Sequence, residues 1–219
     1  KQTPVYIVHF SQKAALEQAN ALLPVAIASK EEKERIAQLI AKFRFGPGFG
    51  KALNKLVRAG IGIHHAGMLP KYRRLVERLA QAGLLKVICG TDTLGVGINV
   101  PIRTVLITAL SKFDGSKNRR LRAREFHQIA GRAGRAGFDT AGTVVVQAPE
   151  HDIENARLLA KAQAKFGDDT KKINQSLSSK RKKAPEGFVG WSEKTFDQLV
   201  AAEPEPLTSS FDITHSMLL

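Results

Sequence analysis

Short apolar runs and longer amphipathic segments alternate through about the first 165 residues of the chain. The apolar runs are rich in valine and isoleucine, as buried strands are. They comprise residues 5–10, 61–65, 85–89, 104–107 and 142–147. Apolar positions at helical spacing predict helices over residues 11–23, 29–43, 50–59, 70–83 and 150–165. Because helices alternate with strands, we predict an α/β fold with a parallel sheet of about five to six strands and helices on both faces.

The pattern changes after residue 166. The chain becomes polar from Asp168 and reaches a basic run, Lys180–Lys183, of the composition typical of a flexible linker. One further amphipathic helix is predicted over residues 192–202, before a Glu-Pro-Glu-Pro break. We therefore divide the chain into three parts. These are an α/β domain (residues 1–166), a basic flexible linker (167–187) and a truncated, partly helical connector (188–219).

Charge and composition restrict the class of protein. The 219 residues carry a net charge of +14 and have a pI near 10.1, which implies an anionic partner such as nucleic acid. Cys89 is the single cysteine, so no internal disulfide forms and a reducing compartment, the cytoplasm, is expected. His64 and His65 are adjacent rather than at metal-ligand spacing, so no metal site is predicted. No apolar run is long enough to span a bilayer and no signal peptide is found, so no membrane association is expected.

The stretch QIAGRAGR, residues 128–135, sets Arg132 and Arg135 three residues apart among small residues. Arginine presents a planar fork of donors that matches phosphate oxygens, and this spacing places both side chains on one face of a helical turn. Gly131 and Gly134 remove bulk beside the arginines, so a ligand or another surface can approach the backbone closely. The alternative interpretation is a solvated basic helix end.

Three other stretches are candidates for binding anions. GTDTLGVGINVP (residues 90–101) follows the third predicted strand, where doubly wound folds place their ligands, and Thr91 offers a hydroxyl and an amide to phosphate. HHAGMLP (residues 64–70) follows the second strand, although two histidines at a strand end are also explained as structural residues. The segment 112–124 holds six basic residues and one acid, which is typical either of a solvated loop or of a surface that follows a phosphate backbone.

Together these stretches resemble the motifs of superfamily 2 helicases. Residues 125–137 resemble motif VI, residues 90–101 resemble motif V, and the strand and loop at residues 5–11 resemble motif IV. HHAGMLP with Tyr72-Arg73-Arg74 is similar to the HHxGLLP segment of the superkiller branch. Over about residues 4–150 the chain thus resembles the second RecA-like, or helicase C-terminal, domain of a superkiller-like DExH helicase. A connector toward a winged-helix or accessory domain would follow.

The resemblance implies roles in ATP hydrolysis for part of this set. Gln128, Arg132 and Arg135 match the motif VI residues that act in catalysis and face ATP, with Arg135 as the arginine finger. Gly97 and Asn99 match motif V residues that face the nucleotide. Asn99 stands where many DEAD-box relatives carry aspartate, which leaves its ribose contact open.

The resemblance also implies a nucleic-acid track, to which the basic segment adds two candidates. The expected nucleic-acid-binding residues are Ser11, His65, Gly67, Arg73, Thr91, Arg119 and Arg120.

Neither a Walker A loop nor a DExH tetrad occurs in the chain, so it is not expected to hydrolyse ATP alone. ATP and Mg²⁺ would be held mainly by the first RecA-like domain of the same polypeptide. The expected function is the second motor domain of an ATP-dependent RNA helicase. It would act as a monomer on single-stranded RNA or on a duplex with an overhang. The alternatives are a DNA repair helicase of the same branch, since DNA is also a possible partner, and a non-catalytic nucleic-acid-binding module.

Overall fold

The computed structural model describes residues 2–92, 100–134 and 139–203. The described strands are β1 (Val5–His9), β2 (Ile61–His64), β3 (Val87–Thr91), β4 (Thr104–Ile107), β5 (Ser111–Phe113), β6 (Asn118–Arg120) and β7 (Thr143–Val146). The described helices are α1 (Gln12–Ala21), α2 (Lys30–Ile40), α3 (Phe49–Arg58), α4 (Pro70–Gln81), α5 (Ala123–Ala130), α6 (Glu150–Phe166), α7 (Thr170–Ser178) and α8 (Glu193–Ala201). None of these helices has the length and apolar character needed to cross a membrane.

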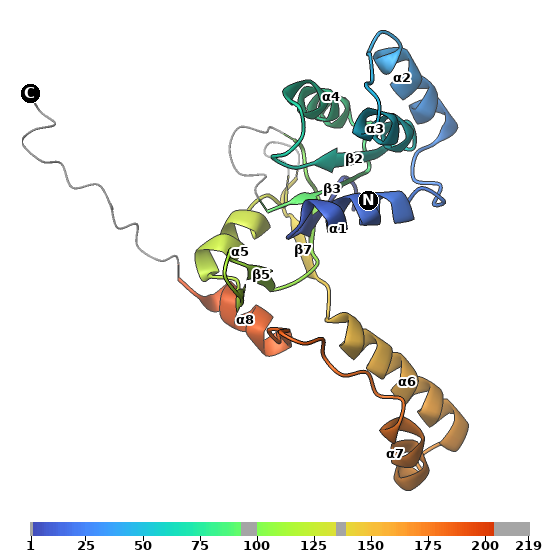
Figure 1. The fold of residues 1–219 in the computed structure, drawn as a ribbon, viewed down its shortest axis with the longest axis vertical. Coiled ribbons are helices and arrows are strands. Elements are labelled where there is room, and N and C mark those ends of the chain that lie inside the picture. Colours follow the sequence, from blue (N-terminus) through green and yellow to red (C-terminus); the bar gives the residue numbers. More distant parts are fainter. Residues whose placement is uncertain (1, 93–99, 135–138, 204–219) are drawn as a thin grey trace, which may run out of the picture.

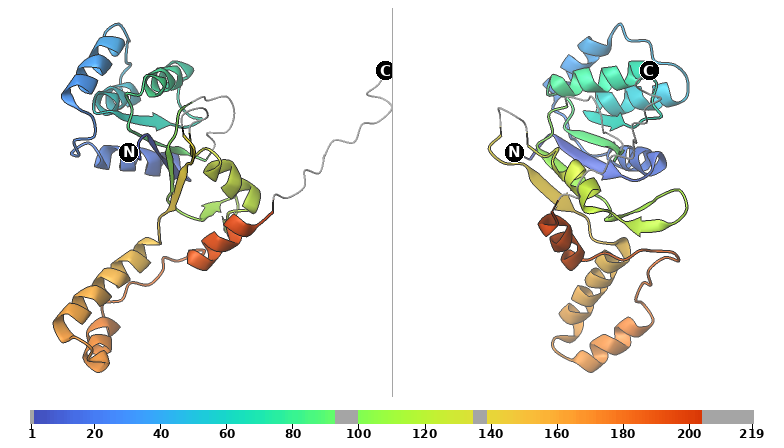
Figure 2. Two further views of the ribbon diagram at one scale, coloured as in Figure 1. Left: turned by 180° about the vertical axis from the view of Figure 1, so that it is seen from behind. Right: turned by 90° about the vertical axis from the view of Figure 1, so that its left-hand side faces the viewer.

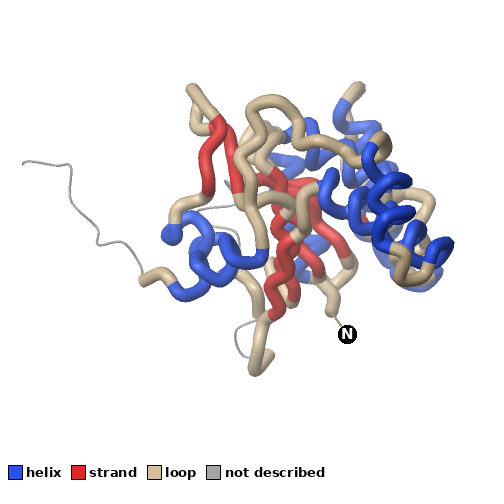
Figure 3. Tube along the Cα trace, turned by 90° about the horizontal axis from the view of Figure 1, so that it is seen from below, coloured by secondary structure: helices blue, strands red, loops and turns tan. Residues whose placement is uncertain are grey.

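A parallel sheet with the strand order β2-β3-β1-β4-β7 forms the centre of the molecule (Figure 1). Helices lie on both sides of it (Figure 3). The predicted α/β class and all five predicted strands are confirmed. Because every connection along the sheet joins parallel strands, the loops that follow β1, β2 and β3 all leave from the same edge of the sheet.

The core forms where the apolar runs meet the apolar faces of the helices. All four residues of β2 are buried, and Val8 in the central strand β1 is fully buried. Ser29 and Glu32 form the expected capping box at the start of α2, with hydrogen bonds of 3.0 and 3.2 Å between side chains and backbone. Pro70 opens α4, where the absent N–H leaves no helical bond unmade.

Two parts of the chain differ from the prediction. No secondary structure was predicted for the basic segment 112–124, which was read either as a solvated loop or as a surface that follows a phosphate backbone, but it contains the antiparallel hairpin β5-β6 and the start of α5. The prediction of a flexible linker over residues 167–187 is wrong for residues 170–178, which form α7. Ile173 and Leu177 lie four residues apart on one face of α7 and are buried against α6, which explains why this polar segment is ordered.

Helices α6 and α7 project from the domain as a helical arm (Figures 1 and 2). After the arm the chain returns to the sheet, where the indole nitrogen of Trp191 donates to the carbonyl of Gln147 at 3.2 Å. The expected last helix is confirmed as α8, which packs on α5. The rings of Phe126 and Phe196 meet edge to face there, with 5.9 Å between their centroids.

Candidate nucleic-acid and nucleotide interface

The carboxyl ends of β1, β2 and β3 bring three predicted site residues to one edge of the sheet. Ser11 lies just beyond the end of β1, His65 directly follows β2, and Thr91 is the last residue of β3. Since β3 is hydrogen-bonded to both β1 and β2, the three loops are neighbours in space. Open α/β sheets bind their ligands outside this edge.

The loops after β1 and β2 are in contact. Ser11 caps α1, because its Oγ accepts a hydrogen bond from the backbone N of Ala14 at 3.1 Å. The neighbouring Gln12 side chain lies against Gly67, where an added Cβ would stand 2.7 Å from Gln12 Oε1. A larger residue at position 67 would therefore force the Gln12 amide to move away from this loop. Ser11 and Gly67 are both exposed, so a nucleic-acid strand can reach them.

His65 is buried rather than exposed at this edge. Its ring meets Phe49 edge to face at 6.0 Å between centroids, and burial lowers its pKa. Nδ1 of His65 has no hydrogen-bond partner within the described part of the chain. A cavity of about 450 Å³ adjoins this residue. Its lining consists of Gly46, Pro47, Phe49, Gly50, His65, Gly67, Met68, Leu69, Lys71 and Tyr72.

His64 is uncharged at neutral pH. Burial lowers its pKa to about 4, and the cations Arg73 and Arg132 act in the same direction. Glu77 lies 3.6 Å from Nε2 of His64 and would favour the protonated ring, but that distance exceeds a hydrogen bond and burial outweighs it. The effect of Arg73 on this ring also shows that Arg73, half-buried on α4, lies near the same edge.

Thr91 is buried, with 6% of its surface exposed, and it is held through its backbone. The buried Tyr6 hydroxyl donates to the carbonyl of Thr91 at 2.8 Å. Burial raises the pKa of Tyr6 well above its usual range, so the hydroxyl keeps the proton that it donates. An added Cβ at Gly90 would collide with this hydroxyl and with the carbonyl of His64. Tight packing of β1, β2 and β3 therefore fixes the start of the loop that carries Thr91.

Motif VI approaches this edge through α5. Gln128 is exposed on α5, and Arg132 follows the end of the helix in a half-buried position. Arg132 lies close enough to act on the pKa values of both Tyr6 and His64, and so it lies near β1 and β2. The predicted residues Arg135, Gly97 and Asn99 lie outside the described residues.

Several contacts that join the motifs could not be anticipated from the motifs alone. Arg103, before β4, pairs with the nearly buried Asp139, which follows motif VI. The backbone N of Gly134 donates to the carbonyl of Ile102 at 2.9 Å. The sequence shows an aspartate, Asp139, shortly after the motif VI arginines, but it does not indicate which residue pairs with that carboxylate.

The basic segment is less free to bind phosphate than its composition indicated. Arg119 donates from both terminal nitrogens to Glu125 at 2.8 Å and lies 3.6 Å from Asp114. Lys112 pairs with Asp92 and with Glu125, each at 2.9 Å. Burial disfavours the ammonium of Lys112, but these hydrogen bonds outweigh burial and raise its pKa. The exposed Arg120 donates from Nε to the carbonyl of Gly190 at 3.0 Å.

Two larger cavities lie elsewhere. They have volumes of about 540 and 530 Å³ and lie beside β7 and Trp191. None of the predicted site residues lines them. The carboxyl edge of the sheet, rather than the largest cavity, therefore brings the predicted residues together.

Comparison with known proteins agrees with this geometry. The family described as helicase conserved C-terminal domain matches residues 17–137, and a domain of unknown function (DUF3516) matches residues 148–219. The superkiller complex protein 2 of Mus musculus is 38% identical over 155 residues, which cover 66% of this chain and 12% of that protein. The DExH-box ATP-dependent RNA helicase DExH11 of Arabidopsis thaliana is 41% identical over 150 residues, which cover 65% of this chain and 11% of that protein. The probable helicase HelY of Mycobacterium tuberculosis is 42% identical over 132 residues, which cover 56% of this chain and 14% of that protein.

The RecA-like sheet and the motifs at its carboxyl edge define a helicase motor domain. The chain belongs to the helicase conserved C-terminal domain family, in its superkiller-like branch. It spans between 11% and 14% of the length of these three relatives.

Proposed function

We propose that the chain is the second motor domain of an ATP-dependent RNA helicase, which supplies an arginine finger and part of the nucleic-acid track. The observation that carries this proposal is the position of Arg132, which lies near the sheet edge that also holds His65 and Thr91. One compact region of this domain would therefore contact both ATP and nucleic acid.

On the nucleotide side, the first RecA-like domain of the same polypeptide would hold Mg²⁺ and most of ATP. ATP hydrolysis supplies the free energy for movement. Gln128 and Arg132 fit a polyphosphate, because an exposed amide and a guanidinium offer donors from adjacent turns. Arg135 would direct its planar fork at the charge that develops on the transferred phosphoryl group. Gly97 and Asn99 would complete the nucleotide contacts.

On the nucleic-acid side, Ser11, Gly67 and Thr91 would contact the backbone of the bound strand. The neutral histidines His64 and His65 add no positive charge at pH 7, so the attraction would come from arginines such as Arg73. Release of charge in the nucleotide cleft after hydrolysis would open the two domains, and repeated closure would move them along the strand.

RNA is the proposed substrate because one of the similar proteins is named as an RNA helicase. A DNA repair helicase is the second candidate, since contacts to phosphates alone do not distinguish the two nucleic acids. A direct competition between RNA and DNA strands of the same sequence separates these candidates. We also propose that the protein acts as a monomer in the cytoplasm, a reducing compartment that suits its single, buried cysteine.

Binding of a fluorescent single strand to the 219-residue chain tests the track. Thr91→Val keeps the shape of the side chain but removes its hydroxyl, and should weaken binding by roughly tenfold if that hydroxyl donates to a phosphate. Thr3→Val, at an exposed position, is the matched control. Equal affinities for the two variants would remove Thr91 from the track.

A further inference from the structure

The arm formed by residues 150–183 carries a dense and exposed positive charge. Between residues 157 and 183 the chain has nine basic residues and only two acidic ones. All nine basic residues are exposed. They are Arg157, Lys161, Lys165, Lys171, Lys172, Lys180, Arg181, Lys182 and Lys183.

Three of these cations form a stripe along α6. Arg157, Lys161 and Lys165 are spaced by four residues, so they lie on one face of the helix and each step advances about 6 Å along its axis. The neighbouring face of α6 packs on α7 through a small core, in which Ala162 and Leu177 are buried. This core holds the stripe away from α7 and toward solvent.

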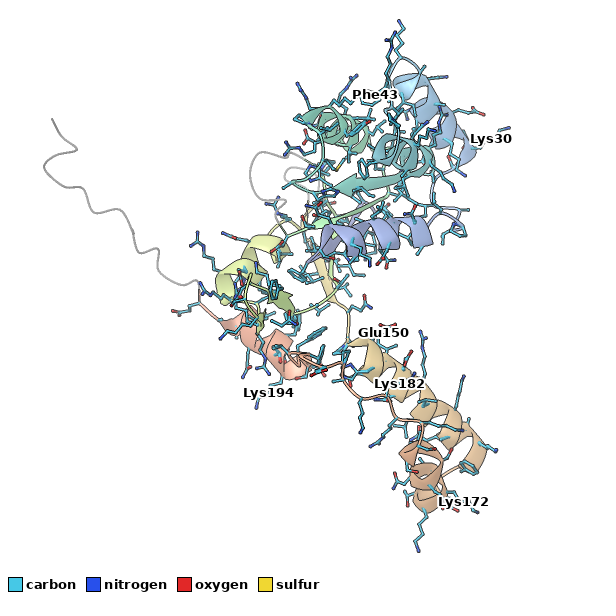
Figure 4. All side chains as sticks on the ribbon, in the orientation of Figure 1. Lys30, Phe43, Glu150, Lys172, Lys182 and Lys194 are labelled. Carbon is cyan, nitrogen blue, oxygen red and sulfur yellow. The ribbon has the colours of Figure 1, made fainter. Side chains whose placement is uncertain are left out.

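The basic run Lys180–Lys183 is also fixed to the arm. Nδ2 of Asn155 donates to the carbonyl of Lys182 at 3.0 Å, and the backbone N of Lys182 donates to Oδ1 of Asn155 at 2.8 Å. Figure 4 shows Lys182 beside α6 and Lys172 at the far end of the arm. Glu154 lies 3.9 Å from Nζ of Lys182, but both side chains are largely exposed and such a pair contributes little. The cations are thus distributed along the whole length of the folded arm.

The arm leaves the domain at the edge that holds the proposed track. Helix α6 begins at Glu150, four residues after β7 ends at Val146, and β7 is parallel to the strands that present His65 and Thr91. A strand bound across that edge can therefore continue toward the arm. Positive charges held at regular spacing on an exposed helix match the phosphates of such a strand.

We propose that the α6-α7 arm is a second nucleic-acid-binding surface, which holds the phosphate backbone outside the motor domain. The proposal goes beyond the motor function and relies on it only for the class of ligand. Residues 150–183 fall within the match to the domain of unknown function, so the arm assigns a role to the first part of that domain.

The salt dependence of binding tests the arm. The 219-residue chain is titrated onto a fluorescent single-stranded RNA of about 30 nucleotides at several salt concentrations. The triple variant Arg157→Gln, Lys161→Gln, Lys165→Gln removes the stripe while keeping good helix formers. The control Lys30→Gln, Lys33→Gln, Arg35→Gln removes the same charge from exposed positions on α2, at the other end of the molecule (Figure 4). Circular dichroism verifies that both variants keep their helices.

If the stripe binds phosphate, its loss reduces the slope of log K against log salt by about 2, because each lost contact to a single strand contributes about 0.7. The α2 control leaves the slope within about 0.3 of the wild-type value. Equal slopes for the two triple variants overturn the proposal. Thr91→Val measured in parallel separates the two claims. A reduced slope in the stripe variant with normal binding by Thr91→Val supports the arm against the track, and the reverse result supports the track alone.

Discussion

Replacing Glu125 by glutamine should destabilise the domain, because this carboxylate joins three segments. It accepts hydrogen bonds from Arg119 at 2.8 Å, from Nζ of Lys112 at 2.9 Å and from the backbone N of Arg122 at 2.9 Å. Lys112 in turn reaches Asp92, at the start of the motif V loop. The Glu125 side chain is only 22% exposed, so solvent screens these interactions weakly.

The shift in the pKa of Glu125 gives the size of the expected loss in unfolding free energy. Hydrogen bonds from Arg119, with those from Arg122 and Lys112, lower this pKa from 4.5 to about 2 despite the opposing effect of burial. At about 1.4 kcal/mol per pH unit, the ionised form contributes about 3 kcal/mol at pH 7. Glutamine keeps the shape but loses the charge. The variant should therefore lose about 2–3 kcal/mol of unfolding free energy and about 4–12 °C in Tm.

The stabilisation by Glu125 should depend on pH. The folded-state pKa lies below the unfolded-state value, so the stabilisation is complete above about pH 4.5 and is lost as the pH falls toward 2. Urea unfolding of both proteins at pH 7 and near pH 3 should show the difference shrinking to about half in acid.

The control for this prediction is Glu17→Gln. Glu17 pairs with Lys13 at 3.8 Å, and both side chains are largely exposed, so this change should cost less than about 0.5 kcal/mol. If Glu125→Gln costs no more than the control at pH 7, the hydrogen bonds to Glu125 do not stabilise the domain.

Three further outcomes are expected. The isolated chain should release no phosphate from Mg-ATP above background, and sustained turnover that Arg135→Ala abolishes would contradict the division of the site between two domains. Arg120→Ala should lower the slope of log K for RNA binding against log salt by about 0.7. Arg119→Ala should mainly reduce stability, because Arg119 is bound to Glu125. A larger loss of slope in Arg119→Ala than in Arg120→Ala would reverse this assignment. Stability should fall as the pH drops from about 6.5 toward 4, because burial keeps His64 from binding a proton in the folded state whereas the unfolded chain binds one. Urea unfolding at pH 7 and pH 5 should show a weaker pH dependence of stability in His64→Gln than in the wild type. An unchanged pH dependence would show that His64 does not cause the loss of stability.

Most of the sheet was predictable from sequence because the strands β1 to β4 are largely buried and therefore appear as short apolar runs. Residues 61–64 illustrate this, since all four are buried in β2. The hairpin β5-β6 was not predictable by this rule, because Lys112, Asn118 and Arg119 are polar. Its order comes from hydrogen bonds to Glu125, a residue just beyond the basic segment. Periodicity carries no information about such pairings.

The candidate site was predictable only in part. The resemblance to helicase motifs identified Thr91 and Arg132, and strand order explains why they lie near one edge. Their supports are different: the Tyr6 hydroxyl and the Arg103–Asp139 ion pair join residues more than 30 positions apart. Side chains that are distant in sequence meet only through the fold, so no local pattern predicts them. The same holds for α7, whose order depends on packing against α6.

Single-turnover ATP hydrolysis by a polypeptide that joins this chain to a first RecA-like domain, with ATP and RNA saturating, tests whether Arg135 is the arginine finger. Arg135→Lys keeps the charge but loses the planar fork, and should reduce the rate by about 10³ to 10⁵ if Arg135 is the arginine finger. Arg132→Lys, the matched control in the same motif, should raise KM more than it lowers the rate if it holds the triphosphate in place. If Arg135 is the finger, the Arg135→Lys rate falls below about a thousandth of the wild-type rate while ATP binding stays nearly normal. More than about a tenth of the wild-type rate would contradict it, because the loss would be smaller than any arginine finger produces.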